Sequence, residues 1–239
     1  MFLCYTSSAY SQTKIKIGIG ANTSSGNANI IGLSSQFSLS REDSTRVWSI
    51  HPSFVYTLIK NNNNDWEERQ RESYISGSYT QKFGRWKLIG IVEAENSALK
   101  KILIRGSSGI GVEYDILRKK QTTIALSNVI MPEIYQSEIP LVKDLFSVRS
   151  STRFKIVWTG PIKIQLVTFF QPAIWSDQEL DFLDNIQLRS INSIEFPISK
   201  KLSLTCYLNV NTSTFSHYIN PKVESTDMNT SILFTYKNF

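Results

Sequence analysis

Hydrophobic side chains occupy every second position along most of this sequence. In residues 13–22, for example, Ile15, Ile17 and Ile19 alternate with lysines and glycines. Successive side chains of a β-strand point to opposite faces, so this pattern is typical of strands with one apolar and one polar face. We predict strands at 13–22, 29–41, 46–60, 70–83, 86–97, 102–114, 121–132, 146–158, 162–174, 185–197, 201–210 and 227–239.

The connections between these predicted strands alternate between short and long. A tight turn such as Gly84-Arg85 follows each even-numbered strand, and long connections follow the third, seventh, ninth and eleventh strands. Outer-membrane barrels place short turns in the periplasm and longer loops outside the cell. An even number of strands of roughly 10–14 residues also suits a bilayer crossed at a tilt. The sequence therefore predicts an all-β fold, a closed antiparallel up-and-down transmembrane β-barrel of about twelve strands.

Aromatic side chains on the apolar parity gather at one predicted end of this barrel. Amphipathic rings prefer the level of the lipid headgroups, so we predict a membrane-interface girdle at the periplasmic end. The alternative explanation is that aromatic residues favour strands in general. A weaker outer girdle is expected at Tyr56, Tyr135 and Phe146. The residues of the periplasmic girdle are Trp48, Phe83, Trp86, Tyr114, Trp158 and Phe196.

The two ends of the chain lead to separate expectations. Residues 1–11 resemble the remnant of a signal peptide, and residues 12–239 are expected to form a single barrel domain. The chain ends on Phe239, an aromatic terminus of the kind that the barrel-assembly machinery recognises. Because Tyr236 and Phe239 lie on opposite parities, we expect either a bulge near Lys237 or a frayed end.

Composition agrees with a membrane barrel. Hydrophobic residues make up 41% of the 239 residues, charged residues 19%, and no apolar run is long enough for a spanning helix. The net charge of +6 comes from scattered basic residues, which argues against nucleic acid as a partner. We expect this excess to be mainly solvated. The alternatives are an anion-preferring pore or contact with lipopolysaccharide phosphates. The two cysteines, Cys4 and Cys206, predict no metal site, and Cys206 is expected to face lipid.

Charged residues of both signs occupy the polar parity, which would face the bore. In a narrow lumen such charges would pair, so we predict a structural network that stiffens the barrel. The alternative is a path for ions or solutes. Gly109 and Gly111 share this face and would leave room for bulky neighbours or for strong curvature. The candidate network comprises Lys87, Glu93, Glu95, Arg105, Glu113, Arg149, Arg153, Lys155, Arg189 and Glu195, with Lys14, Lys16 and Lys163 on the same parity.

Catalytic motifs do not stand out. Neither His51 nor His217 has a serine and a carboxylate grouped near it in the sequence. We see no zinc-protease helix motif and no phosphate-binding glycine loop. The acidic residues within 177–184 resemble a calcium loop only weakly. We therefore predict a protein that is not an enzyme, with no catalytic residues, metal or cofactor.

Three segments resemble a known family. They are the R-W-x-L-x-G strand at 85–90, the segment 103–106 with its arginine, and the alternate glycines within 109–117. Together they are similar to a bacterial YdiY-like family of unknown function, whose members are described as salt-induced outer-membrane proteins. The similarity extends over about 14–239. The departures are Ala94, where the family commonly has tyrosine, and one extra residue near the end. The resemblance implies an outer-membrane barrel and supplies no catalytic residues.

Taken together, these patterns predict a bacterial outer-membrane β-barrel protein without catalytic activity. It would be either a narrow channel or a structural or stress-related envelope protein. The alternatives are an outer-membrane hydrolase and a soluble β-barrel that binds a small ligand. We expect a monomer in the outer membrane of a Gram-negative bacterium. Its expected partners are outer-membrane lipids, lipopolysaccharide and, during biogenesis, the barrel-assembly machinery.

Overall fold

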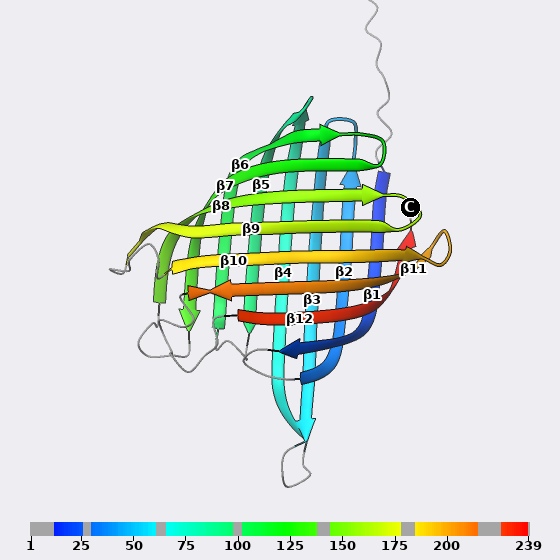
Figure 1. Cartoon of the computed structure of the whole chain (residues 1–239). Helices are drawn as coiled ribbons and strands as arrows, with labels where there is room; N and C mark the ends of the chain where they lie inside the picture. The colour runs from blue at the N-terminus through cyan, green and yellow to red at the C-terminus, as the bar shows by residue number, and fades with distance from the viewer. Residues whose placement is uncertain are drawn as a thin grey trace, which may run out of the picture.

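The computed structural model describes residues 12–25, 30–60, 66–97, 102–137, 144–177, 185–214 and 226–238. These residues form twelve antiparallel strands that close into a barrel (Figure 1), because β1 pairs with both β2 and β12. The predicted fold class is confirmed. The strands are β1 Gln12–Ser25, β2 Ile30–Glu42, β3 Arg46–Lys60, β4 Trp66–Phe83, β5 Trp86–Ser97, β6 Ile102–Arg118, β7 Thr122–Ser137, β8 Asp144–Thr159, β9 Lys163–Ser176, β10 Ile186–Pro197, β11 Leu202–Ser213 and β12 Thr226–Asn238.

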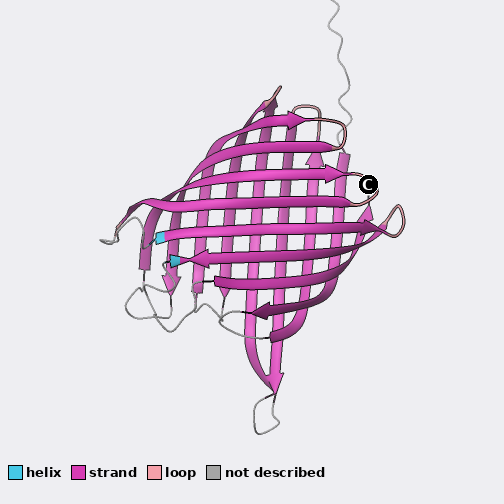
Figure 2. Cartoon of the chain, in the orientation of Figure 1, coloured by secondary structure: helices cyan, strands magenta, loops and turns pink. Residues whose placement is uncertain are grey.

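Several strands are longer than their sequence pattern predicts. β6 continues to Arg118 rather than ending at Tyr114, and β7 continues to Ser137 rather than Pro132. The predicted ends are too early because polar side chains there, such as Asp115 and Glu133, indicate connections in the sequence. Inside a barrel a polar side chain on the lumen parity is compatible with a continuing strand. The figure of the secondary structure shows how little of the described chain lies outside strands (Figure 2).

The connections that follow even-numbered strands are tight and lie at one end of the barrel. The turn between β4 and β5 consists of Gly84 and Arg85, and Gly84 has a φ of 65°, which favours glycine. The turn between β2 and β3 is held by Asp43, whose Oδ1 accepts hydrogen bonds from the backbone N–H groups of Thr45 at 2.8 Å and Arg46 at 2.6 Å. The odd-numbered strands β1 to β11 end on the opposite side of the barrel from these turns.

The barrel has two walls whose strands cross at a steep angle. β7–β12 run across the front of Figure 1, and β1–β5 run behind them. Glycines permit close backbone approach where curvature is strong. A Cβ atom on Gly111 would lie 2.0 Å from the carbonyl oxygen of Asn128, and one on Gly20 would lie 1.7 Å from that of Ile232. Strong curvature, rather than a bulky neighbouring side chain, therefore explains Gly111.

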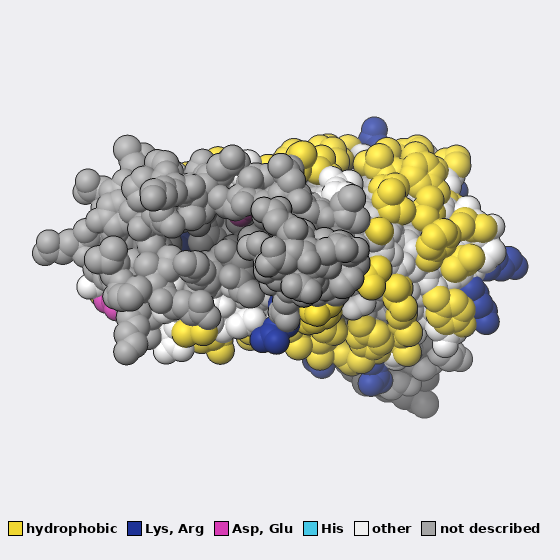
Figure 3. Space-filling view, turned by 90° about the horizontal axis from the view of Figure 1, so that it is seen from below, with side chains coloured by type: hydrophobic (Ala, Val, Ile, Leu, Met, Phe, Trp, Pro, Cys, Tyr) yellow, Lys and Arg dark blue, Asp and Glu magenta, His cyan; other side chains and the backbone are white. Residues whose placement is uncertain are grey.

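Many apolar side chains of this barrel are exposed and many charged side chains are buried, which is the reverse of the distribution in a soluble protein. Large hydrophobic side chains are exposed all round the outer wall, with Ile110 at 73%, Leu33 at 67% and Ile19 at 64% exposure. Figure 3 shows hydrophobic side chains gathered over the part of this face that is drawn in colour. The buried interior contains charged groups such as Glu133 and Arg149. Cys206 lies on the outward parity, with an intermediate exposure. In the described ranges, no helix is long and apolar enough to span a membrane.

The last strand keeps a regular register to its end. Lys16 pairs with Lys237 and Ile15 pairs with Asn238, without a shift between β1 and β12. The expected bulge near Lys237 is therefore wrong for the described residues, because unbroken alternation already places Tyr236 outside and Lys237 inside. Phe239 and the predicted signal remnant at 1–11 lie outside the described residues.

Candidate functional site

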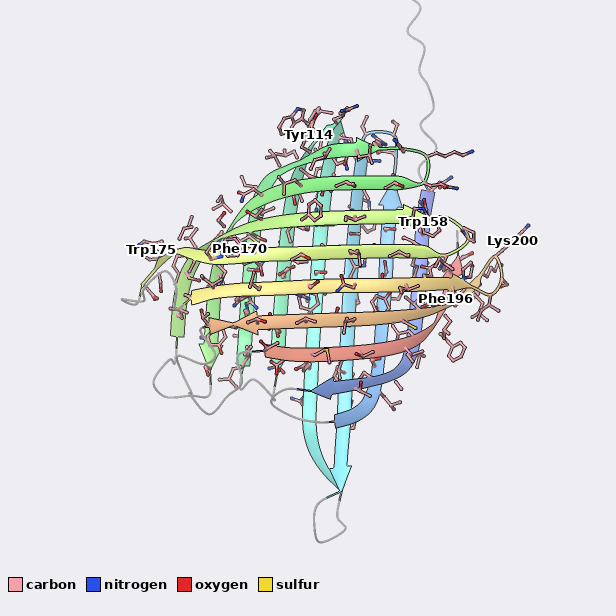
Figure 4. All side chains as sticks on the ribbon, in the orientation of Figure 1. Tyr114, Trp158, Phe170, Trp175, Phe196 and Lys200 are labelled. Carbon is pink, nitrogen blue, oxygen red and sulfur yellow. The ribbon has the colours of Figure 1, made fainter. Side chains whose placement is uncertain are left out.

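The six predicted girdle aromatics all lie toward the end of the barrel with the tight turns, where Tyr114 pairs with Trp86 although β6 continues to Arg118. Phe83 pairs with Trp86, and the Trp86 ring lies 4.8 Å from the ring of Tyr114. Figure 4 shows Tyr114, Trp158 and Phe196 away from the opposite end, where Trp175 lies. Phe83, Trp86 and Phe196 are exposed on the outer wall, and Trp48, Tyr114 and Trp158 are partly so. This is the placement expected where rings meet lipid headgroups.

The opposite end has aromatic contacts of its own. The ring of Phe146 lies 5.7 Å from that of Trp175 in an edge-on contact, and Phe54 stacks on Tyr56 at 6.4 Å. The sequence reading placed Trp175 in a loop, whereas β9 extends to Ser176. The expectation for Tyr135 is wrong: it pairs with Arg105 on the lumen parity, so it does not belong to the outer girdle.

Glu133 stands at the centre of the most deeply buried charge cluster. Its carboxylate lies 2.6 Å from Nη2 of Arg105 and 2.8 Å from Nε of Arg149. Arg105 also reaches Glu95 at 3.3 Å, and Arg149 donates to Oδ1 of Asn185 at 2.7 Å. The side chains of Glu133 and Arg149 are each only 2% exposed. We call Glu95, Arg105, Glu133 and Arg149 the Glu133 cluster.

A second paired group lies nearer the tight turns. Lys87 Nζ lies 2.8 Å from Glu113 and 2.6 Å from Asp115, and Arg153 pairs with the other oxygen of Glu113. Arg153 Nε also donates to Ser127 Oγ at 3.1 Å. These contacts tie β5, β6, β7 and β8 together inside the wall. Glu195, from the predicted network, pairs with Lys237 on β12.

One layer of side chains crosses the bore. The guanidinium of Arg189 on β10 lies 5.2 Å from the ring centre of Tyr74 on β4 and 6.0 Å from that of Phe169, which are cation–π distances. Tyr74 in turn donates its hydroxyl to Glu93 at 2.7 Å. β4 and β10 are on opposite walls of the barrel. A second crossing joins Arg105 Nη2 to Gln187 Oε1 at 2.8 Å. We call the layer of Tyr74, Phe169 and Arg189 the septum.

The septum separates two polar chambers within the lumen. The outer chamber measures about 170 Å³ and is lined by Glu95, Arg105, Gln187 and other polar residues. The inner chamber, toward the tight turns, measures about 450 Å³ and is lined by residues that include Lys16, Lys155 and Lys163. Both chambers share Tyr74 and Arg189 in their walls, as well as Gln36, Ser53 and Asn209. The two chambers therefore adjoin at the level of Tyr74 and Arg189.

Of the ten residues in the predicted network, Lys155 has no ion-pair partner among the residues that the structure describes. No carboxylate of the described residues comes within 4 Å of its ammonium group, and the same holds for Lys16 and Lys163. Glu113, the acidic group whose charge acts on Lys155, is already bound by Lys87 and Arg153. We call Lys16, Lys155 and Lys163 the lysine cluster.

His51 contacts a serine but no acid. Its Nε2 lies 3.0 Å from Ser49 Oγ, and Ser49 also bonds Ser78 at 2.8 Å. The positive charge of Lys16 acts on this ring. No carboxylate of the described residues hydrogen-bonds to His51, so the third member of a hydrolytic triad is lacking there. Within the described ranges no group of three histidine, cysteine or acidic residues could hold a metal ion. His217 lies outside these ranges.

The sequence reading missed four residues that complete this site. The pattern predicts a short turn at Asp115, a long connection at Glu133 and a possible bulge at Lys237, and it does not single out Tyr74. Three of them could have been found from the sequence, because the alternation of lumen-facing and outward-facing positions continues through them without a break. Glu133 follows Val129 and Met131, Asp115 follows Glu113, and Lys237 follows Thr235. Only tertiary structure could show that Tyr74 meets Arg189.

Solved outer-membrane barrels share this architecture. The NanC porin matches with a TM-score of 0.57 at 8% identity, over 94% of this chain and 99% of that chain. The translocator domain of the autotransporter NalP from Neisseria meningitidis matches at 0.52 and 6% identity, over 99% and 91% of the two chains. The KdgM porin, in complex with disordered oligogalacturonate, matches at 0.50 and 8% identity, over 95% and 99%. At these identities the likeness concerns the fold alone.

Sequence comparison identifies the family. No curated protein matches the sequence significantly. The profile of the family described as "Protein of unknown function, DUF481" matches residues 17–237, which is nearly the whole barrel. The resemblance to a YdiY-like family of unknown function is thereby confirmed. This chain belongs to the DUF481 family.

Proposed function

We propose that this chain is a narrow channel in the outer membrane of a Gram-negative bacterium, and that it is not an enzyme. The observation on which the channel rests is the thinness of the septum. Polar chambers lie on both sides of Tyr74 and Arg189, and these side chains line both chambers. Side chains can change rotamers far faster than strands can separate. A small displacement of this layer would join the two chambers into one polar path.

The outer wall supports the membrane location. Ile110, Leu33 and Ile19 are exposed on a closed barrel, and aromatic rings border its tight turns. A soluble ligand-binding barrel would have to keep this apolar surface in water, where it would promote association. The porin and autotransporter barrels with the same fold favour the same location. Lipids and lipopolysaccharide would then surround a monomer inserted by the assembly machinery.

The lack of an acid beside His51 supports the view that the protein is not an enzyme. A serine and a histidine within 3.0 Å resemble two members of a hydrolytic triad, but the general base needs a partner that stabilises its charged form. The neighbouring charge at His51 is the cation of Lys16 rather than a carboxylate. The geometry therefore favours transport over hydrolysis.

Conductance in planar bilayers tests the channel. We expect the wild-type barrel to give small current steps and Tyr74→Ala to give steps several times larger, because it removes one side of the septum. Tyr79→Ala is the matched control, since Tyr79 lies on the same strand but is exposed on the outer wall. It should conduct like the wild type. Folding is checked by the shift in gel migration on boiling.

Two results would contradict the proposal. In the first, folded Tyr74→Ala inserts yet passes no more current than Tyr79→Ala, which would favour a purely structural barrel. In the second, the protein fractionates with soluble proteins when the cells are lysed without detergent, which would exclude the membrane location.

A further inference from the structure

The inner chamber has a strongly unequal charge. Its walls contain five cationic residues and one acidic residue, and that acid, Glu195, is already paired with Lys237. Two of the cations are also engaged, since Arg153 pairs with Glu113 and Arg189 stacks on Tyr74. The lysine cluster is what remains. The cationic residues in the lining are Lys16, Arg153, Lys155, Lys163 and Arg189.

The three lysines come from different parts of the barrel and converge on one space. Lys16 is on β1, Lys155 is on β8 and Lys163 begins β9. All three line the same chamber, and no carboxylate of the described residues lies within 4 Å of any of them. Like charges that lack a paired acid repel one another, and ionisable groups in such surroundings cluster at functional sites.

Several uncharged polar groups line the same chamber. They include Gln36, Ser38, Gln165, Thr205 and Tyr207. Amide N–H and hydroxyl groups can donate hydrogen bonds to oxygen atoms of a solute, and ammonium groups supply charge-assisted bonds. At about 450 Å³ the chamber falls within the range of small-molecule sites. It is suited to an oxygen-rich anion rather than to a cation or an apolar molecule.

We propose that the inner chamber is a binding site for small multivalent oxyanions, carrying carboxylate or phosphate groups, and that the lysine cluster holds them. This inference rests on the proposed function in one respect, because the solute would reach the site through the bore. Paired charges elsewhere in the lumen leave no comparable cation free for such a role in the described residues. The site makes the channel prefer anions and delays their passage at this level.

Calorimetric titration of the purified full-length barrel in detergent tests the site without requiring conductance. Citrate and inorganic phosphate are the two probes, and glucose is the neutral control, all at one ionic strength set with sodium chloride. We expect saturable binding of citrate, phosphate or both, and none of glucose. The two arms distinguish carboxylate from phosphate as the preferred group. Lys155→Gln or Lys163→Gln should weaken binding about tenfold or more, because each removes a charge-assisted hydrogen bond.

Lys200→Gln is the matched control. Lys200 is exposed in a tight turn, so this substitution removes the same charge at a position outside the chamber (Figure 4). It should leave the affinity unchanged. The gel shift on boiling verifies that each variant is folded. The proposal is overturned if the barrel binds neither citrate nor phosphate more tightly than it binds chloride. It is also overturned if Lys200→Gln weakens binding as much as Lys155→Gln does.

The failures of the two proposals are distinguishable. If citrate or phosphate binds through the lysine cluster while Tyr74→Ala passes no current, the anion site stands and the channel does not. If Tyr74→Ala conducts while both titrations are flat, the channel stands and the anion site is overturned.

Discussion

The Glu133 cluster and the lysine cluster lie in the same lumen and both contain cationic side chains, but they differ in pairing. Arg105 and Arg149 share one carboxylate, and both Arg149 and Glu133 are almost completely buried. Lys155 and Lys163 instead face a chamber, without a carboxylate within 4 Å in the described chain. We therefore assign two roles to the charged side chains of the lumen. Those with an oppositely charged partner stabilise the barrel, and those without one bind a solute.

Solvation explains why the two clusters must differ in this way. A buried charge loses its hydration, and only a well-placed opposite charge offsets that loss. An unpaired lysine can persist in the lumen only where water or a solute reaches it. Breaking a pair should consequently harm stability, whereas neutralising a lysine of the inner chamber should harm binding.

The largest expected effect is that of Glu133→Ala. It leaves the guanidinium groups of Arg105 and Arg149 without their shared acid, and removing one partner of a buried pair costs about 3–5 kcal/mol. Urea unfolding in detergent, followed by gel shift, measures the loss. A loss below about 1 kcal/mol would contradict the structural role assigned to this cluster.

Glu113→Gln should have an intermediate effect. It removes the carboxylate that Lys87 and Arg153 share, but Asp115 still lies 2.6 Å from Lys87, and Arg153 is partly exposed. We expect a loss of about 1–3 kcal/mol in the same unfolding assay. If Glu113→Gln lost as much stability as Glu133→Ala, the depth of burial would not determine how much each group of ion pairs contributes.

Lys155→Gln should leave stability nearly unchanged. The substitution removes no ion pair. It loses the attraction of Glu113 but also relieves repulsion by Arg153, Lys87 and Lys163, so we expect the free energy of unfolding to change by less than about 0.5 kcal/mol. Unfolding midpoints without added citrate or phosphate provide the measurement. A loss of about 2 kcal/mol or more would place Lys155 with the structural charges instead.

Salt should act on the two clusters unequally. Raising sodium chloride from about 0.1 to about 1 M shortens the Debye length from about 10 to about 3 Å. Repulsion within the wetted lysine cluster is then screened, so any gain in stability from Lys155→Gln should vanish. The penalty for Glu133→Ala should persist, because buried pairs are screened much less. Equal salt dependence of the two variants would contradict the difference in burial.

The smallest effect concerns a charge outside the lumen, Asp43 in the turn between β2 and β3. Hydrogen bonds from the backbone N–H groups of Thr45 and Arg46 hold the pKa of its carboxyl below the usual range. Its contribution to stability is therefore complete above the unfolded pKa of about 3.9 and is lost as pH falls through the folded value. Asp43→Asn should make the stability of this turn depend slightly less on acid pH. Hydrogen exchange of the Thr45 backbone amide, measured as a function of pH, would show the change. An exchange profile equal to that of the wild type would contradict this role of Asp43.

Alternation in the sequence was enough to predict the barrel and the lumen parity of Arg105, Glu113 and Lys155. It could not predict which of these residues have partners. Lys87 and Lys155 share residue type and parity, yet only Lys87 meets acids. The difference depends on the stagger between strands, which sets the depth of each side chain. The meeting of Tyr74 and Arg189 also depends on which strands face one another across the bore.

The reversal potential of the Tyr74→Ala channel across a potassium chloride gradient tests the central claim most directly, namely that unpaired lysines inside a paired wall control what passes. We predict a reversal potential that favours chloride and moves toward zero when Lys155→Gln and Lys163→Gln are added. A potential that favours potassium, or one that does not respond to these two substitutions, would contradict the account.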